Sequence, residues 1–151
     1  MSQTLTRLLI HIVFSTKHRE DLILPAFERS LHRYMAGICK ALESPALEIG
    51  GTANHVHVLT SLSKNIALSD LVMNMKKDSS KWIKSHAAQA RAFRWQDGYA
   101  AFSIGESGTA ALTKYIRTQK DHHRKSTYED ELRLLVKKYK VIEFDERYAW
   151  D

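Results

Sequence analysis

The chain has 151 residues with one cysteine, Cys39, and its 23 lysine and arginine side chains against 17 carboxylates give a formal net charge of +6. One cysteine excludes an internal disulfide, the N-terminus has no signal-peptide pattern, and no apolar run approaches the roughly 20 residues of a membrane span. We therefore expect a basic, cytoplasmic protein in which residues 1–151 form one domain, with residues 127–151 as a C-terminal helical extension and tail.

The first half of the chain predicts three strands and one long helix. Residues 7–16 are rich in Leu, Ile and Val, which predicts a strand buried on both faces. Pro25 marks the start of a helix, because proline favours the first helical position, and Pro45 follows its end. Residues 46–51 and 55–62 predict two further strands, and the glycines between them favour a hairpin.

The second half adds one strand and three helices. A helix is predicted from Ser69, whose hydroxyl would cap it, and residues 99–104 predict a fourth strand. Two glycines in the segment 105–108 allow the chain to turn into a helix that contains Tyr115, and a last helix is predicted over 127–139. The order predicts an α+β protein of the ferredoxin-like (RRM-like) fold, an antiparallel sheet with helices on one face plus C-terminal helices.

Most of the excess positive charge lies in residues 64–94. This segment holds seven basic residues and two aspartates, so it contributes +5 of the net charge of +6. Lys77, Lys81 and Lys84 recur at spacings of four and three, so a helix would present them as one row. Such a row is the footprint expected for a phosphate backbone, although a solvated lysine face is also common in proteins that bind no nucleic acid.

Arg94 ends this basic segment and is followed closely by two aromatic residues, Trp95 and Tyr99. The guanidinium is a candidate DNA contact, and the two rings are candidates for stacking on unpaired bases. The alternative is that both rings pack in the core beside a turn, because large aromatic side chains are usually buried.

Two histidines alternate with valines in the third predicted strand, in the run Asn54-His55-Val56-His57. Side chains along a strand point alternately to opposite faces, so His55 and His57 share one face. Two imidazoles side by side suit a divalent metal. The alternative is two hydrogen-bonded histidines on a half-exposed strand.

Tyr115 and Gln119 are four residues apart, so within one helix they would share a face. A tyrosine hydroxyl is a nucleophile with a high pKa, and it becomes useful for phosphoryl transfer when a metal polarises the phosphate. Gln119 would supply an oxygen ligand to a metal held by the two strand histidines. No other tyrosine of the chain has a glutamine one helical turn later.

Three further histidines carry less weight. His122 and His123 follow the predicted tyrosine helix and point in different directions, so we expect phosphate contacts or plain surface there, although a metal ligand could come from this pair. His11 lies in the first strand, and we expect a structural role for it.

In this order, the motifs resemble those of the single-tyrosine HUH transposases of the IS200/IS605 type, which cut and rejoin single-stranded DNA. The resemblance also includes the opening strand and the runs Gly50-Gly51-Thr52-Ala53-Asn54 and Trp95-Gln96-Asp97-Gly98-Tyr99, and it covers nearly the whole chain. It implies that Tyr115 forms a 5′-phosphotyrosine intermediate. It also implies that His55, His57 and Gln119 hold Mg²⁺ or Mn²⁺.

The resemblance further implies the partners. The substrate would be single-stranded DNA with hairpin ends, so the protein would be nucleoid-associated when bound to DNA. The family resemblance implies a homodimer with shared active sites, in which the histidines of one subunit face the tyrosine helix of the other. Thr118 and Gln119 stand where domesticated relatives associated with palindromic repeats tend to have Asn-Pro, which favours the mobile-element branch.

Other functions fit parts of the same pattern. A non-catalytic single-stranded DNA or RNA-binding module would use His55, His57 and Tyr115 to contact bases without chemistry. A domesticated relative would keep the chemistry and no longer transpose. A metal-dependent hydrolase of small phosphoesters would leave Tyr115 and the basic segment without a role.

Overall fold

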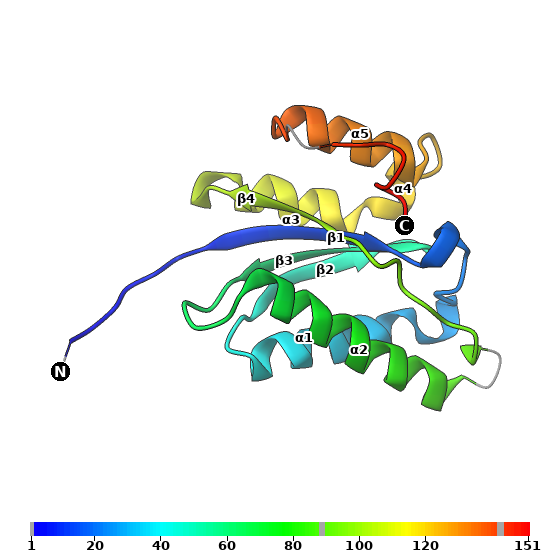
Figure 1. The fold of residues 1–151 in the computed structure, drawn as a ribbon, viewed down its shortest axis with the longest axis horizontal. Helices are drawn as coiled ribbons and strands as arrows, with labels where there is room; N and C mark the ends of the chain where they lie inside the picture. The colour runs from blue at the N-terminus through cyan, green and yellow to red at the C-terminus, as the bar shows by residue number, and fades with distance from the viewer. Residues whose placement is uncertain (1, 88–89, 142–143) are drawn as a thin grey trace.

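The centre of the protein is a four-stranded antiparallel sheet with helices on both faces (Figure 1). The computed structural model describes residues 2–87, 90–141 and 144–151. The strands are β1 (Leu9–Ser15), β2 (Ala46–Gly51), β3 (His55–Ser61) and β4 (Ala100–Ile104), and their order across the sheet is β2-β3-β1-β4. This order confirms the predicted ferredoxin-like α+β class.

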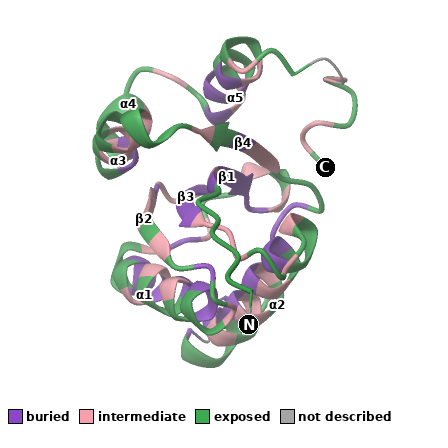
Figure 2. Ribbon diagram, turned by 90° about the vertical axis from the view of Figure 1, so that its left-hand side faces the viewer, coloured by how far each residue is buried: buried purple, intermediate pink, exposed green. Residues whose placement is uncertain are grey.

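The helices form two layers, one on each side of the sheet (Figures 1 and 2). On one side lie α1 (Pro25–Ala41) and α2 (Leu68–His86). On the other lie α3 (Thr109–Arg117), α4 (Gln119–His122) and α5 (Tyr128–Lys138). The short 3-10 helices η1 (Lys17–Arg19) and η3 (Glu106–Gly108) follow β1 and β4. The C-terminal helices therefore cover the sheet face that the first two helices leave open.

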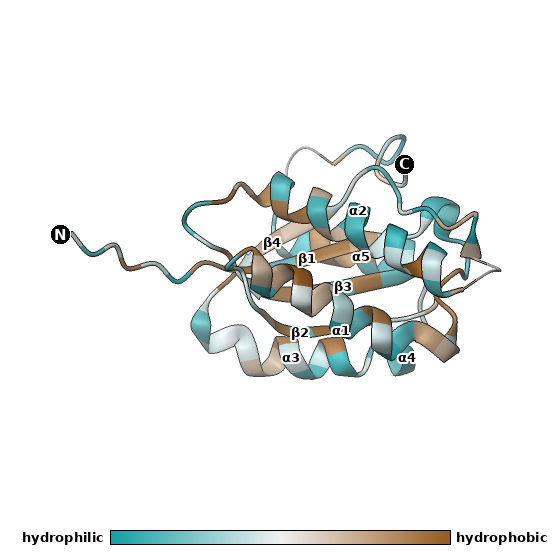
Figure 3. Cartoon of the chain, turned by 90° about the horizontal axis from the view of Figure 1, so that it is seen from below, coloured by the Kyte–Doolittle hydropathy of each residue, from teal (hydrophilic) through white to brown (hydrophobic). Residues whose placement is uncertain are grey.

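The two central strands divide their side chains between these layers. Ile12 and Phe14 of β1, with Val56 and Val58 of β3, belong to the large apolar core under α1 and α2. In Figure 3 both strands are brown, whereas the two helices that cover them carry teal residues as well. Alternate residues of the same strands face α3 and α5, so all the histidines of β1 and β3 lie on that second face.

The predicted element boundaries hold within one or two residues, with two corrections. Helix α1 begins at Pro25 as predicted. The cap of α2 is not Ser69: the helix begins at Leu68, its N-cap is Ala67, and no side chain caps it. The carbonyl of Ala67 already accepts hydrogen bonds from the backbone N–H groups of Asp70 and Leu71, so the first turn closes before the serine.

The second correction concerns the predicted tyrosine helix, which is interrupted. Helix α3 ends at Arg117, Thr118 has the non-helical angles φ −102° and ψ 21°, and α4 begins at Gln119. Residues 142–143 of the predicted tail lie outside the described residues, and the segment 144–151 returns to the sheet, where Gly98 N–H donates to the carbonyl of Asp151. None of the described helices is long and apolar enough to cross a membrane.

Candidate active site

The histidines of β3 form the floor of a polar site on the second face of the sheet. His55 and His57 are fully buried, and their ring centroids are 5.2 Å apart. They pair across the sheet with Ser15 and Val13 of β1, so neighbouring strands hold both side chains on the face that α5 covers. The prediction that the two rings share one face is confirmed.

The inner nitrogen of each ring has its own hydrogen-bond partner. His55 Nδ1 lies 2.8 Å from Asn54 Oδ1 and 3.0 Å from Thr52 Oγ1, both on the β2–β3 turn. His57 Nδ1 lies 2.8 Å from Nε2 of His11, which is also fully buried. Burial, and next the neighbouring His57, lower the pKa of His11 to about 3, so His11 is neutral at physiological pH. Both Nε2 atoms of the β3 pair are left to face α5.

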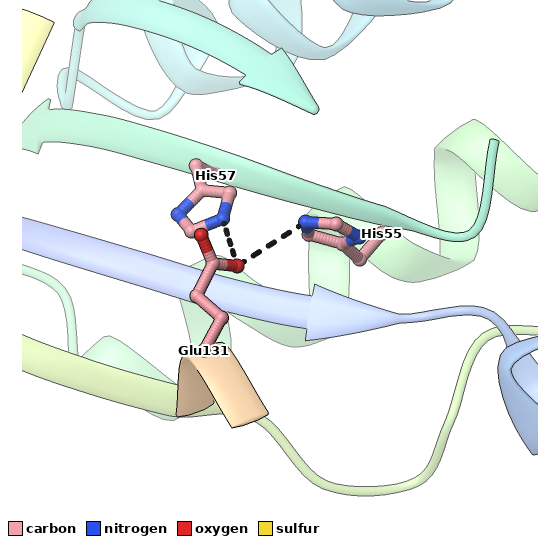
Figure 4. A group of neighbouring side chains, drawn as sticks. All are labelled: His55, His57 and Glu131. Carbon is pink, nitrogen blue, oxygen red and sulfur yellow. Dashed lines mark hydrogen bonds and ion pairs between the residues drawn. The ribbon is translucent and has the colours of Figure 1, made fainter. Parts of the chain in front are cut away.

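Glu131 of α5 lies where these Nε2 atoms converge (Figure 4). Its Oε1 is 3.0 Å from His57 Nε2, 3.4 Å from His55 Nε2 and 3.1 Å from His123 Nε2. Burial raises the pKa of this carboxyl, but hydrogen bonds from His123, His55 and His57 outweigh that effect and lower it below its ordinary value. Glu131 is therefore a buried carboxylate surrounded by imidazoles.

Glu131 is not among the site residues predicted from the sequence, although α5 carries a signal for it. The buried apolar positions of this helix are Tyr128, Leu132 and Leu135, which form one stripe. Glu131 lies on the same stripe, three residues after Tyr128, where a helix that only covers a sheet would carry an apolar residue. Because the two preceding residues, Glu129 and Asp130, are also acidic, the sequence also indicates a charged first turn there.

Tyr115 and Gln119 reach the same carboxylate from the opposite side, in spite of the break between their helices. The hydroxyl of Tyr115 donates to Glu131 Oε2, and Gln119 Nε2 donates to the same oxygen over 2.9 Å. Gln119 Oε1 lies 3.0 Å from His55 Nε2. Burial first, and the contact with Glu131 next, raise the pKa of Tyr115, so its hydroxyl is protonated. The four predicted residues are thus brought together within one chain.

Open space adjoins Tyr115 on two sides. A cavity of about 450 Å³ between α3, α5 and β4 is lined by Tyr115, His11 and Lys138, among others. A second cavity, of about 300 Å³, is lined by Tyr115, Glu131 and the same lysine. The nucleophile candidate is therefore accessible to a substrate larger than water.

The donor set fits a divalent metal. His55, His57 and Glu131 each offer one ligand atom, and these atoms lie within 4.8 Å of one another. Imidazole nitrogen with carboxylate oxygen suits Mn²⁺ and related ions, and the hydrogen bonds at both Nδ1 atoms are of the kind that orient metal-binding histidines. Gln119 adds an amide oxygen beside His55.

The remaining predicted residues divide between the candidate site and the rest of the molecule. His123 contacts Glu131, whereas His122 lies against the ring of Tyr115, with ring centroids 4.7 Å apart, and its Nε2 is 3.1 Å from Thr118 Oγ1. The exposed row Lys77, Lys81 and Lys84 is on α2, in the layer on the far side of the sheet from the histidines. Within one chain this row does not line the site.

The aromatic pair after Arg94 divides between core and surface. Trp95 is buried, its ring centroid is 4.9 Å from that of Phe14, and its Nε1–H donates to Ser79 Oγ. With only 7% of its surface exposed, Trp95 packs in the core, as the alternative to base stacking expects. Tyr99 is 39% exposed and Arg94 is exposed, so both stay available to a ligand.

Comparison with known proteins gives one family and several similar chains. The sequence model of the family described as "Transposase IS200 like" matches residues 4–119. The transposases for insertion sequence element IS200 of Salmonella typhimurium and Salmonella typhi are each 25% identical to this chain over 114 residues, which cover 72% of this chain and 74% of each relative.

Two solved structures share the fold. A putative transposase from Deinococcus radiodurans R1 has a TM-score of 0.64 at 18% identity, over 79% of this chain and 98% of that one. A REP-associated tyrosine transposase bound to a REP hairpin has a TM-score of 0.58 at 15% identity, over 82% of this chain and 74% of that one. At these identities the two structures support the fold alone.

Proposed function

The chain belongs to the IS200-like transposase family, and from this premise we propose that it is a metal-dependent transposase of single-stranded DNA that cuts and rejoins strands through Tyr115. The observation that carries the proposal is the convergence of Tyr115 and Gln119 on the two histidines of β3, around one carboxylate. A nucleophile, metal-ligand types and a buried negative charge in one place are what metal-assisted phosphoryl transfer needs.

In the proposed reaction the oxygen of Tyr115 attacks a DNA phosphate. A bond forms between this oxygen and phosphorus as the hydroxyl loses its proton. The bond from phosphorus to the 3′-oxygen breaks, and that oxygen takes up a proton and leaves as a 3′-hydroxyl, while a 5′-phosphotyrosine stays on the protein. Attack by a 3′-hydroxyl on this link reverses the step and rejoins a strand. Mg²⁺ or Mn²⁺, held by His55, His57 and Gln119, would stabilise the charge that develops on the phosphate oxygens.

We propose single-stranded DNA with hairpin ends as the substrate, because the family acts on DNA and one relative of the same fold is described as bound to a REP hairpin. The substrate lies in the nucleoid, so we propose that location for the bound protein. Five further residues would contact parts of the DNA that are distant from the cut bond, because the lysine row lies across the sheet from the site. They are Lys77, Lys81, Lys84, Arg94 and Tyr99.

The resemblance implies a homodimer with shared active sites, and we keep it as the alternative to a site complete within one subunit, which the contacts of the described chain favour. In the described chain Tyr115 contacts Glu131 of its own chain, and its ring centroid lies 5.8 Å from that of its own His57. Sharing would require α3 to leave these contacts and to make the same ones with a partner.

Covalent capture tests the proposal. Wild-type protein is incubated with Mn²⁺ and hairpin-bearing single-stranded DNA, and denaturing electrophoresis detects a protein–DNA adduct. Tyr115→Phe removes one oxygen, so we expect no adduct and nearly unchanged DNA binding. Tyr128→Phe is the matched control: its ring also lies beside His55, but its hydroxyl donates to Gln96, so we expect the adduct to persist.

An adduct with Tyr115→Phe would show that another residue is the nucleophile. Absence of an adduct with wild-type protein on every hairpin-bearing strand from the DNA flanking its gene would favour the alternative, a binding module of the same fold without chemistry.

A further inference from the structure

Glu131 lies outside the part of the chain that the family model matches, which ends at Gln119. Its carboxylate is nevertheless at the centre of the candidate site and only 6% exposed. A carboxylate is retained in a protein interior when it is paired with a positive group or coordinates a metal. The geometry around its two oxygens decides between these roles.

The distances around Oε1 are those of metal ligands that surround one ion. Two ligands that each lie about 2.1 Å from an ion and subtend a right or tetrahedral angle are about 3.0 to 3.4 Å apart. Oε1 of Glu131 lies 3.0 Å from His57 Nε2 and 3.4 Å from His55 Nε2. The pair His55 Nε2 and Gln119 Oε1 is 3.0 Å apart. A single ion can therefore contact His55, His57 and Glu131, and the amide oxygen of Gln119 lies beside His55.

The protonation of His55 points the same way. Asn54 Nδ2 donates to the carbonyl of Arg19, which turns Asn54 Oδ1 toward His55. That oxygen can only accept a hydrogen bond, so Nδ1 of a neutral His55 carries the proton and Nε2 is a lone pair. This lone pair faces two oxygens, Gln119 Oε1 at 3.0 Å and Glu131 Oε1 at 3.4 Å. A metal ion among these three atoms would be coordinated by all of them.

We propose that Glu131 is the anionic ligand of the metal centre, and that it coordinates through Oε1 beside His55 and His57. The proposal rests on the proposed function for the presence of a metal, and it adds the C-terminal extension to the active site. Oε2 meanwhile accepts the hydroxyl of Tyr115, so one carboxylate joins the metal to the nucleophile. Because Glu131 is on α5, metal binding must also tighten the docking of α5 on the sheet.

Binding of Mn²⁺ to DNA-free protein, measured by titration calorimetry, tests the ligand. Glu131→Gln keeps the shape of the side chain and removes its charge, so we expect the dissociation constant for Mn²⁺ to rise about tenfold or more. Asp130→Asn is the matched control, because it removes a carboxylate from the same turn of α5 at an exposed position, and we expect no change. Circular dichroism of each variant checks the fold.

His57→Ala distinguishes a failure of this proposal from a failure of the proposed function. If His57→Ala abolishes Mn²⁺ binding and Glu131→Gln leaves it unchanged, the metal centre stands and Glu131 is not its ligand. If neither variant alters Mn²⁺ binding, the metal centre of the proposed function is wrong as well, and Glu131 is the partner of a protonated histidine.

Hydrogen exchange of the wild-type protein tests the same proposal without a substitution. With Mn²⁺ we expect the amides of α5, residues 128–138, to exchange at least several-fold more slowly, because a ligand on this helix ties it to β3. A bound ion that leaves the exchange of α5 unchanged would mean that only residues of the other elements hold it. Faster exchange would mean that the ion expels the carboxylate, and either result overturns the proposal.

Discussion

Each histidine of β3 is held at Nδ1 by a different kind of partner. Asn54 and Thr52 fix His55 from the preceding turn, whereas the neutral ring of His11 fixes His57 from the neighbouring strand. Such partners set the tautomer and the orientation of a metal-binding ring. His11 Nδ1 has no hydrogen-bond partner among the described residues, so the hydrogen bond that this ring makes within the described chain is the one to His57. The expected structural role of His11 is thus a role in the site.

Lys76 is the basic side chain that turns inward from the charged segment of α2. Its Nζ donates to the carbonyl oxygens of Gln96, Asp97 and Gly98, at distances of 2.6 to 3.2 Å, and therefore anchors the loop before β4. Burial lowers the pKa of Lys76 from 10.5 to about 8. The side chain of Lys76 is therefore not available to DNA. The surface of residues 64–94 carries less positive charge than their sequence indicates.

We predict a pH-dependent contribution of Lys76 to stability. Between about pH 8 and pH 10.5 the unfolded chain keeps the proton on Lys76 and the folded chain releases it, so a rise in pH favours the folded state. The free energy of unfolding of wild type, minus that of Lys76→Met, should therefore increase over this interval. Urea unfolding at a series of pH values measures it.

Lys77→Met is the control for this experiment, because it makes the same substitution at the next, exposed position of α2. A difference between wild type and Lys76→Met that stays flat from pH 8 to pH 10.5 would contradict the prediction.

At the residue scale, the sequence predicts the members of the site that have distinctive partners nearby in the chain. Strand alternation brings His55 and His57 together, and a one-turn spacing indicates Tyr115 with Gln119. Glu131 is different: the helical stripe of α5 indicates that it faces inward, but only the docking of α5 on the sheet brings it to the histidines.

At the scale of elements, the position of Tyr115 depends on how closely α3 approaches the hairpin of β2 and β3. Ile116 of α3 is buried against Leu59 of β3. Beside it, a Cβ atom on Gly50 would overlap the backbone carbonyl oxygen and the side chain of Ile116. Because the obstacle is backbone, a side-chain rotation cannot relieve it. Glycine at position 50 therefore sets the distance between α3 and the sheet.

We predict that Gly50→Ala pushes α3 outward and lowers cleavage. The overlap should cost about 1 to 3 kcal/mol of stability, as overpacking of a well-packed contact does. Tyr115 should move with the helix away from Glu131, so adduct formation should fall more steeply than the folded fraction. Thermal unfolding and the adduct assay, carried out on the same preparation, measure the two effects.

Gly105→Ala is the matched control, since a Cβ atom there meets nothing within 4 Å and its φ of −77° suits any residue. It should keep both stability and adduct yield. If Gly50→Ala behaves like Gly105→Ala, the close approach of α3 is not what positions Tyr115.

The elements also show what the sequence could not place. Helical periodicity predicts the lysine row of α2, but it carries no information on which face of the sheet the helix covers, so the row could not be assigned to the far layer. The break at Thr118 was likewise hidden, because the residues around it are compatible with a continuous helix. The fold class, by contrast, followed from the sequence, since the βαββαβ order of elements predicts the ferredoxin-like arrangement.

In the whole molecule, one layer of helices encloses most of the apolar core, and the other layer forms the candidate site. The layer of α1 and α2 encloses the large apolar core. The layer of α3, α4 and α5 rests on smaller apolar clusters around a polar centre, where buried imidazoles, an amide and a carboxylate replace apolar contacts. Metal removal should therefore loosen the second layer and leave the first intact.

The same layer raises the question of whether one chain or two build the site. Contacts that hold α3 are made within one chain: the Tyr115–Glu131 hydrogen bond, the Arg117–Glu48 ion pair and the approach of Ile116 to Gly50. A shared site would repeat these contacts between two subunits of a homodimer, with α3 exchanged. The two arrangements place the same side chains together, so a functional test must separate them.

We predict that mixing two inactive variants, His57→Ala and Tyr115→Phe, restores no cleavage, because the contacts of α3 favour a complete site within each subunit. If the sites are shared, random exchange of subunits gives about one site in four with both its histidines and its tyrosine intact, and cleavage returns to that extent. Each variant carries a different affinity tag. Co-purification of the two tags after partial unfolding and refolding proves that any dimers have exchanged subunits. A mixture of wild type and Tyr115→Phe controls for activity lost in the treatment. Recovery in the mixture of the two variants would refute the complete site and establish the shared one, while the chemistry assigned to Tyr115 would stand in both cases.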